Sequence, residues 1–201
     1  KQKTAYEIMP SLVGSEMCIR DRYDFGCLLA ALGLGGPVGL PLAVSLFLAR
    51  AVALVLGAMG LATLRHRARG DGFQRVSGTA RRLPWSVAGL LTGGLGLAGF
   101  PLTAGFPGHW ALLQLLGQQL PRAAIILLLA AIGVIVGHLR GLRALLGPLH
   151  EPEVEREPFL ASKLVAALLL VSLLLSLNPQ LLAELVATIT SALSTITEVK
   201  L

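Results

Sequence analysis

Long apolar stretches separated by short polar connections dominate the chain from about residue 23 onward. A transmembrane helix needs about 20 mainly apolar residues to cross roughly 30 Å of hydrocarbon. Measured against that length, the pattern predicts about five transmembrane segments, the first of them truncated. The expected segments are residues 23–34, 41–64, 84–116, 122–146 and 159–177. The predicted fold class is therefore an all-α integral membrane protein, built as a helical bundle.

The third apolar segment, residues 84–116, is predicted to be a discontinuous helix. Two prolines and two glycines fall within residues 101–108. Proline removes a backbone donor and glycine loosens a helix, so we expect a break near residues 100–108. The many glycines just before this break are expected to thin the helix so that neighbouring helices approach closely.

Arginine placement indicates how often the broken segment crosses the membrane. The connection at residues 65–82 holds six arginines and one acidic residue, and Arg140 and Arg143 mark the end of a later segment. Arginine-rich loops are cytoplasmic by the positive-inside rule. A single crossing of residues 84–116 leaves both arginine-bearing ends on the same side, so we expect one crossing.

The C-terminal stretch, residues 180–198, has apolar side chains at helical spacing and hydroxyl side chains on the other side. This pattern is typical of an amphipathic helix. We expect it to lie at the membrane surface or on a neighbouring subunit rather than to span.

The amino-acid composition agrees with the prediction of an integral membrane protein. The chain has 201 residues, of which 54% are hydrophobic and 14% charged, with a net charge of +6. Soluble domains average about a quarter charged residues, and the long apolar runs exclude a disordered chain. Because the basic residues cluster in loops, a nucleic-acid partner is not expected. Cys18 and Cys27 are too few for a cysteine-based metal site, and neither a metal nor a cofactor is expected in this chain.

Residues 1–22 differ from the remainder, being mixed, charged and aperiodic. The segment ending SLVGSEMCIRDR resembles a translated sequencing-adapter tract, which implies a non-native tract. An ordinary polar N-terminal arm is the alternative.

His109 is the leading candidate for a functional side chain. It follows the Phe106-Pro107-Gly108 break, about midway along an expected crossing. Ionisable residues at that depth are costly and are functional candidates by default. Histidine, with a reference pKa of about 6.5, can load and release a proton near neutral pH. Spacing alone does not choose between this role and a structural one, in which a neutral ring binds a freed carbonyl.

Arg50 and His138 are weaker candidates. Arg50 lies ten residues into its apolar segment, where arginine costs about 2.5–3.5 kcal/mol, so it should face the bundle or a wet cavity. Arginine does not release its proton, so the role predicted is electrostatic; the alternative is a structural partner to a carbonyl or to a lost acid. His138 could extend a proton path, or be an ordinary interfacial histidine. Ser172 and Ser176 have no companions at a spacing typical of catalysis.

The stretch from Ala80 to Leu116 resembles the discontinuous helix of the antiporter-like subunits in the membrane arm of respiratory complex I, and is closest to the N-type subunit. The likeness rests on Arg82-Leu83-Pro84 and on LAGFPLTAGFPGH, which ends at His109. His109 stands where that family usually has lysine or glutamate. Arg50 stands at a family lysine, while its companion histidine is replaced by Leu46.

The resemblance implies that residues 23–178 are the C-terminal transmembrane part of a proton-translocating subunit of an NADH-quinone oxidoreductase. It implies a multi-pass protein of the bacterial inner membrane, whose partners are the lipid bilayer and other membrane-arm subunits. Electrons and quinone would belong to those partners, so this chain would be a non-catalytic subunit. Two alternatives stay open: a cation/proton antiporter or membrane-bound hydrogenase subunit, and a structural membrane subunit without transport.

Overall fold

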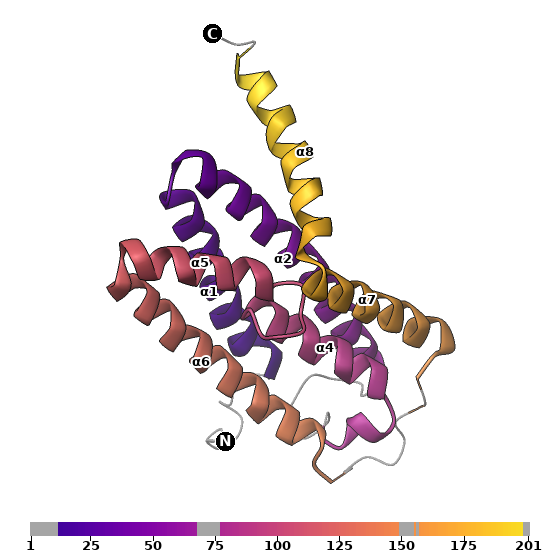
Figure 1. Cartoon of the computed structure of the whole chain (residues 1–201). Helices are drawn as coiled ribbons and strands as arrows, with labels where there is room; N and C mark the ends of the chain where they lie inside the picture. Colours follow the sequence, from indigo (N-terminus) through magenta and orange to yellow (C-terminus); the bar gives the residue numbers. More distant parts are fainter. Residues whose placement is uncertain (1–11, 68–76, 149–154, 156, 199–201) are drawn as a thin grey trace, which may run out of the picture.

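The computed structural model describes residues 12–67, 77–148, 155 and 157–198. This part of the chain is all helical and contains no strand, which confirms the predicted all-α class. The elements in chain order are α1 (Leu12–Gly33), α2 (Gly36–Arg67), the short 3₁₀ helix η2 (Thr79–Arg81), α4 (Pro84–Leu97), α5 (Phe106–Gln119), α6 (Pro121–Leu145), α7 (Phe159–Leu177) and α8 (Pro179–Glu198) (Figure 1).

Three of the described helices are long and apolar enough to cross a membrane, namely α2, α6 and α7. Helix α1 does not meet that standard because Arg20, Asp21, Arg22 and Asp24 lie on it. Helices α4 and α5 have 14 residues each, fewer than the roughly 20 that one crossing needs. Length and composition therefore support three spanning helices where five segments were expected.

Helix α1 passes from Arg22 to Tyr23 without interruption. Residues 1–22 were predicted to be a separate N-terminal tract, and residues 1–11 of it lie outside the described residues. The interpretation of residues 1–22 as non-native stays a prediction.

The predicted break between residues 84 and 116 is present, slightly earlier than expected. Helix α4 ends at Leu97, and α5 begins at Phe106. Pro107 occupies the first turn of α5, where the missing N–H has no helical partner in any case. The proline therefore starts the second helix instead of ending the first. Positive φ angles at Gly99 and Leu102, 70° and 68°, turn the chain between the two.

Helices α4 and α5 share one uninterrupted neighbour, α6. Helix α6, with 25 residues, is about 37 Å long at 1.5 Å per residue. It packs against both α4 and α5 (Figure 1). The single discontinuous crossing of residues 84–116 stays a prediction.

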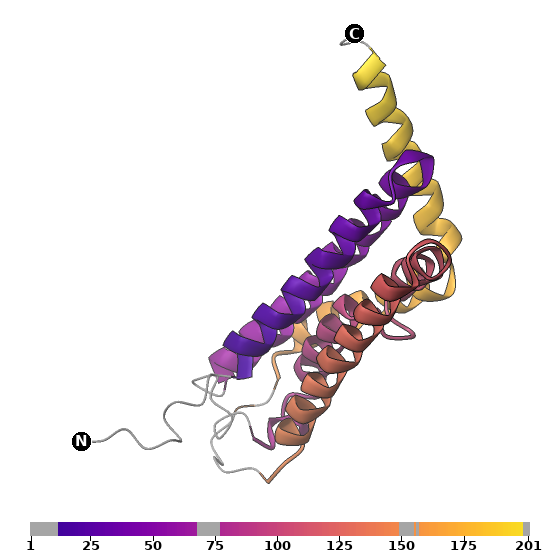
Figure 2. The same cartoon turned by 90° about the vertical axis from the view of Figure 1, so that its left-hand side faces the viewer.

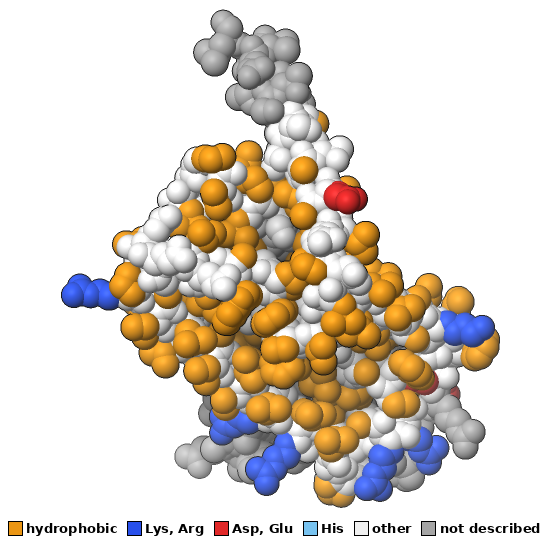
Figure 3. Space-filling model, in the orientation of Figure 1, with side chains coloured by type: hydrophobic (Ala, Val, Ile, Leu, Met, Phe, Trp, Pro, Cys, Tyr) orange, Lys and Arg blue, Asp and Glu red, His pale blue; other side chains and the backbone are white. Residues whose placement is uncertain are grey.

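The two arginine-bearing regions, the connection before α4 and the C-terminal part of α6, lie at the same end of the bundle. The Gly78 amide donates to the Ala144 carbonyl at 3.4 Å, and Ser77 Oγ donates to the Pro148 carbonyl at 3.0 Å. Lys and Arg side chains gather at this lower end in Figure 3. Arg156 and the central part of the 65–82 connection lie outside the described residues.

Close contact between α2 and α4 depends on glycine, as the sequence predicted. A Cβ on Gly93 would lie 2.5 Å from the Gly57 nitrogen and 2.6 Å from the Ala53 oxygen. A side chain at this position would therefore force the two backbones apart. The packing gives α4 a fixed register on α2, which also carries Arg50.

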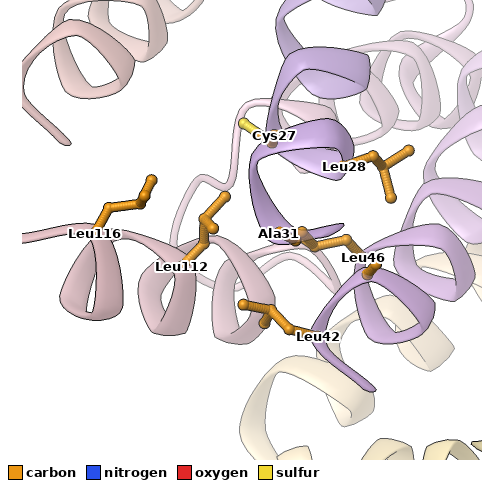
Figure 4. Packing of buried hydrophobic residues seen from close by; sticks show 8 residues of the cluster. Cys27, Leu28, Ala31, Leu42, Leu46, Leu112 and Leu116 are labelled. Carbon is orange, nitrogen blue, oxygen red and sulfur yellow. The ribbon is translucent and has the colours of Figure 1, made fainter. Parts of the chain in front are cut away.

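Helices α1, α2 and α5 share an apolar cluster (Figure 4). Its buried members are Cys27, Leu28, Ala31, Leu42, Ala43, Leu46, Leu112 and Leu116.

Helix α8 covers the range predicted for the amphipathic helix. Leu182 and Val186 are buried, whereas Leu181 and Leu185 are exposed. The helix contacts α2 and α7 and then extends beyond the other helices (Figure 2). Its position on a membrane surface or on another subunit stays a prediction.

Candidate functional site

An ion pair joins α1 to α2 inside the bundle. Arg50 Nη1 donates to Asp24 Oδ2 at 2.5 Å, and the Asp24 side chain is only 2% exposed. Arg50 thus faces the bundle, as expected. The interpretation that its acidic partner was lost is wrong, because Asp24 supplies that acid. Asp24 was missed because it lies at the edge of the first apolar stretch, beside the charged N-terminal residues.

His109 reaches the same aspartate from α5. Its Nδ1 lies 2.8 Å from the Gly105 carbonyl oxygen, and its Nε2 lies 3.8 Å from Asp24 Oδ1. A carbonyl oxygen only accepts hydrogen bonds, so Nδ1 carries the hydrogen. Nε2 is buried and has no hydrogen-bond partner in the described part of the chain. A purely structural histidine was expected to bind a freed backbone carbonyl, and His109 makes that contact. It also has a second ring nitrogen that lacks a partner and faces a carboxylate.

The break between α4 and α5 makes room for the imidazole ring. A Cβ on Gly99 would lie 2.5 Å from His109 Cβ and 2.6 Å from its Cγ. The Tyr23 ring stacks with the imidazole ring, with ring centroids 6.0 Å apart and planes inclined by 12°. Glycine at residue 99 thus allows both the positive φ angle of the backbone and the close approach of the imidazole ring.

A buried serine secures the connection between the two half-helices. Ser172 Oγ, on α7, accepts a hydrogen bond of 3.0 Å from the Ala104 amide. The sequence offered no signal for this role, because the hydroxyl acts on the backbone of a remote segment. The contact holds the connection that leads into His109.

The two oxygens of Asp24 face different groups. Oδ2 accepts from Arg50, and Oδ1 faces His109 Nε2. With a neutral ring and an ionised carboxylate, two acceptors oppose each other and the three side chains have no net charge. One added proton, on Nε2 or on Oδ1, removes that opposition and raises the net charge to +1. The 3.8 Å separation exceeds a direct hydrogen bond, so a small movement or a bridging water is needed to close it.

The apolar cluster borders this charged group on all three helices. Cys27 follows Asp24 by three positions, and Leu112 follows His109 by three. Leu46 precedes Arg50 by four. Residues three or four apart share a helix face, so each of these cluster residues stands one turn from a member of the charged group.

His138 lies on α6 and packs against Gly94 of α4, where an added Cβ would overlap its ring. Its Nδ1 lies 2.9 Å from the Val134 carbonyl oxygen. In the described part of the chain, no hydrogen bond or ion pair joins it to Asp24, Arg50 or His109. The described residues also contain no group of three or more His, Cys, Asp or Glu that could hold a metal ion.

Glu157 caps the start of α4, a contact that the sequence did not predict. Its carboxylate accepts hydrogen bonds from the amides of Trp85 at 3.1 Å and Ser86 at 2.6 Å, and from the Ser86 hydroxyl. A carboxylate at a helix N-terminus satisfies free amides and interacts favourably with the helix dipole. The contact also ties the connection before α7 to α4.

These features define an all-helical bundle, apolar enough for a membrane, with a buried histidine, aspartate and arginine beside a helix break. No protein-family model matches the chain, and no curated protein matches it as a relative. The resemblance of Ala80–Leu116 to the antiporter-like subunits of complex I stays a prediction.

Proposed function

We propose that this chain translocates protons as part of an antiporter-like membrane subunit, and that the proton binds between His109 Nε2 and Asp24 Oδ1. One observation carries the proposal. A buried, unpartnered imidazole nitrogen faces a carboxylate at 3.8 Å beside a helix break. A purely structural histidine gains nothing from that arrangement, because an unsatisfied buried nitrogen costs free energy.

The proposed membrane orientation uses the three spanning helices and the α4–α5 pair as one further crossing. The apolar part of α1 completes the bundle and brings Asp24 to mid-depth. Strongly exposed apolar side chains on α6, such as Ile126 at 68%, suit contact with lipid. The arginine-bearing end would face the cytoplasm, as in a multi-pass protein of the bacterial inner membrane.

Each residue has a distinct role in this mechanism. His109 accepts the proton on Nε2 while Nδ1 stays bound to the Gly105 carbonyl. Asp24 stabilises the resulting imidazolium, and Arg50 holds the other carboxylate oxygen in place. Arg50 also keeps the protonated group at net positive charge, which favours release when a neighbouring charge changes. Moving one charge through 100 mV costs about 2.3 kcal/mol.

Proton transport in one direction requires that the His109–Asp24 site open to only one side of the membrane at a time. The apolar cluster formed by α1, α2 and α5 closes the side toward the α1–α2 turn. Access from the arginine-bearing end is therefore the easier route in this conformation. Release on the other side requires the cluster to separate. Electron transfer and quinone chemistry are assigned to partner subunits of the complex.

The test is proton pumping by membrane vesicles that carry the intact complex. His109→Gln and Asp24→Asn should each abolish most of the pumping at unchanged electron flux. His138→Gln is the matched control and should leave pumping near the unsubstituted level. Normal pumping by both site variants would refute the proposal.

A structural role is the second candidate, favoured by the Asp24–Arg50 ion pair and by the bond from His109 to Gly105. It predicts that His109→Gln lowers the thermal stability of the complex but leaves the number of protons per electron unchanged. Proton translocation predicts that His109→Gln lowers the number of protons per electron but leaves the thermal stability of the complex unchanged. The two measurements together therefore separate the candidates.

A further inference from the structure

A pocket of about 560 Å³ opens where the start of α4 meets the start of α7. It lies outside the charged group at His109 and at the arginine-bearing end of the bundle. Its lining residues are Arg81, Arg82, Pro84, Trp85, Glu157 and Ser162.

The pocket has an excess of positive charge. The Glu157 carboxylate is engaged by the Trp85 and Ser86 amides and the Ser86 hydroxyl. Arg81 and Arg82 are exposed, and neither forms an ion pair with an acidic residue in the described part of the chain. Two guanidinium groups thus face solvent beside one carboxylate that is already hydrogen-bonded.

Exposed aromatic and apolar side chains stand on the same two elements as the pocket lining. Trp85 is 47% exposed, and Phe159 and Leu160 at the start of α7 are more than 70% exposed. Lys163 Nζ lies 4.2 Å from the centre of the Phe159 ring. Exposed tryptophan together with basic side chains is typical of the membrane–water interface. Leu164 continues the apolar outer face of α7 deeper along the bundle.

We propose that Arg81 and Arg82 bind the phosphate of an anionic membrane phospholipid, with Trp85 at headgroup depth and the acyl chains along α7. Guanidinium groups match phosphate oxygens in geometry and charge. The apolar face of α7 below the arginines suits a lipid rather than a soluble phosphate compound. The proposal depends on the membrane orientation given above, but not on proton transport.

The test measures quenching of Trp85 fluorescence in the full chain reconstituted into phosphatidylcholine bilayers. A Trp110→Phe background leaves Trp85 as the single tryptophan. The probe is a small fraction of phosphatidylglycerol with brominated acyl chains, and equally brominated phosphatidylcholine gives the reference. We expect the anionic lipid to be enriched around Trp85 by tenfold or more, because each arginine near the surface contributes roughly a factor of five.

The control variant is Arg140→Gln/Arg143→Gln, which removes the same charge at the same end of the bundle. Arg81→Gln/Arg82→Gln should reduce the quenching to the phosphatidylcholine level, while the control keeps it. Equal quenching by both lipids, or equal loss in both variants, would overturn a specific site. Complete displacement by millimolar inorganic phosphate would assign the pocket to a soluble phosphate ligand and would also overturn the lipid proposal.

Discussion

Asp24 Oδ1 and His109 Nε2 face each other across 3.8 Å in the interior of the bundle, on helices that are far apart in sequence. Arg50 holds the other oxygen of the same carboxylate. The aspartate therefore links a permanent cation to a titratable ring, and this relationship determines what the site can do. One added proton raises the net charge of the three side chains to +1.

Removing the carboxylate should destabilise the protein, because Arg50 would lose its counter-ion inside the bundle. Asp24→Asn is expected to lower the free energy of unfolding by about 3–5 kcal/mol. Asp24→Asn/Arg50→Gln should recover part of that loss, since no unpaired charge then remains. Thermal unfolding in detergent would measure these two variants and Arg50→Gln alone. A double variant whose loss of stability equals the sum of the two single losses would contradict the ion pair.

Gly99→Ala should disturb the histidine while leaving the helices intact. Alanine in the left-handed region costs about 1–2 kcal/mol, and its Cβ would collide with His109. We expect reduced stability together with a loss of proton pumping. Gly133→Ala is the control, because an added Cβ on α6 has nothing within 4 Å. Equal effects of the two substitutions would argue against the tight fit of the ring.

Ser172→Ala should loosen the connection between α4 and α5. The Ala104 amide would be left buried without an acceptor, at a cost of about 1–3 kcal/mol. Hydrogen exchange should accelerate at residues 98–105 more than in α2. Ser176→Ala, one turn further along α7, should not change that exchange. Unchanged exchange in Ser172→Ala would show that this contact does not hold the connection.

Glu157→Ala should weaken the start of α4. Loss of a capping side chain costs about 0.5–2 kcal/mol, and the amides of Trp85 and Ser86, left without their acceptor, should exchange faster. Glu184→Ala removes an equal charge from the exposed face of α8 and serves as the control. A stability loss no larger than that of the control would contradict the capping role.

Features that depend on nearby residues were predictable. The helical class follows from apolar stretches of membrane length, and the glycines before Leu97 predicted that some neighbouring helix packs closely against this segment. The break was predicted a few residues late, since Pro107 was placed within the break although it stands in the first turn of the next helix. The count of five crossings combined apolar length with the placement of the arginines. Helix α1, with its charged residues, and the two short half-helices are not among the three described helices that are long and apolar enough to cross a membrane.

The sequence by itself determined that His109 and Arg50 stand in apolar helices and need partners there, because burial of a charge is costly wherever the helix packs. Only the tertiary structure decided that the partner of both is Asp24, that Ser172 secures the connection and that Glu157 caps α4. Each of these contacts joins helices whose rotation and relative height come from packing across the bundle. Local periodicity shows which face of a helix is apolar, but it does not specify which residue of another helix lies opposite.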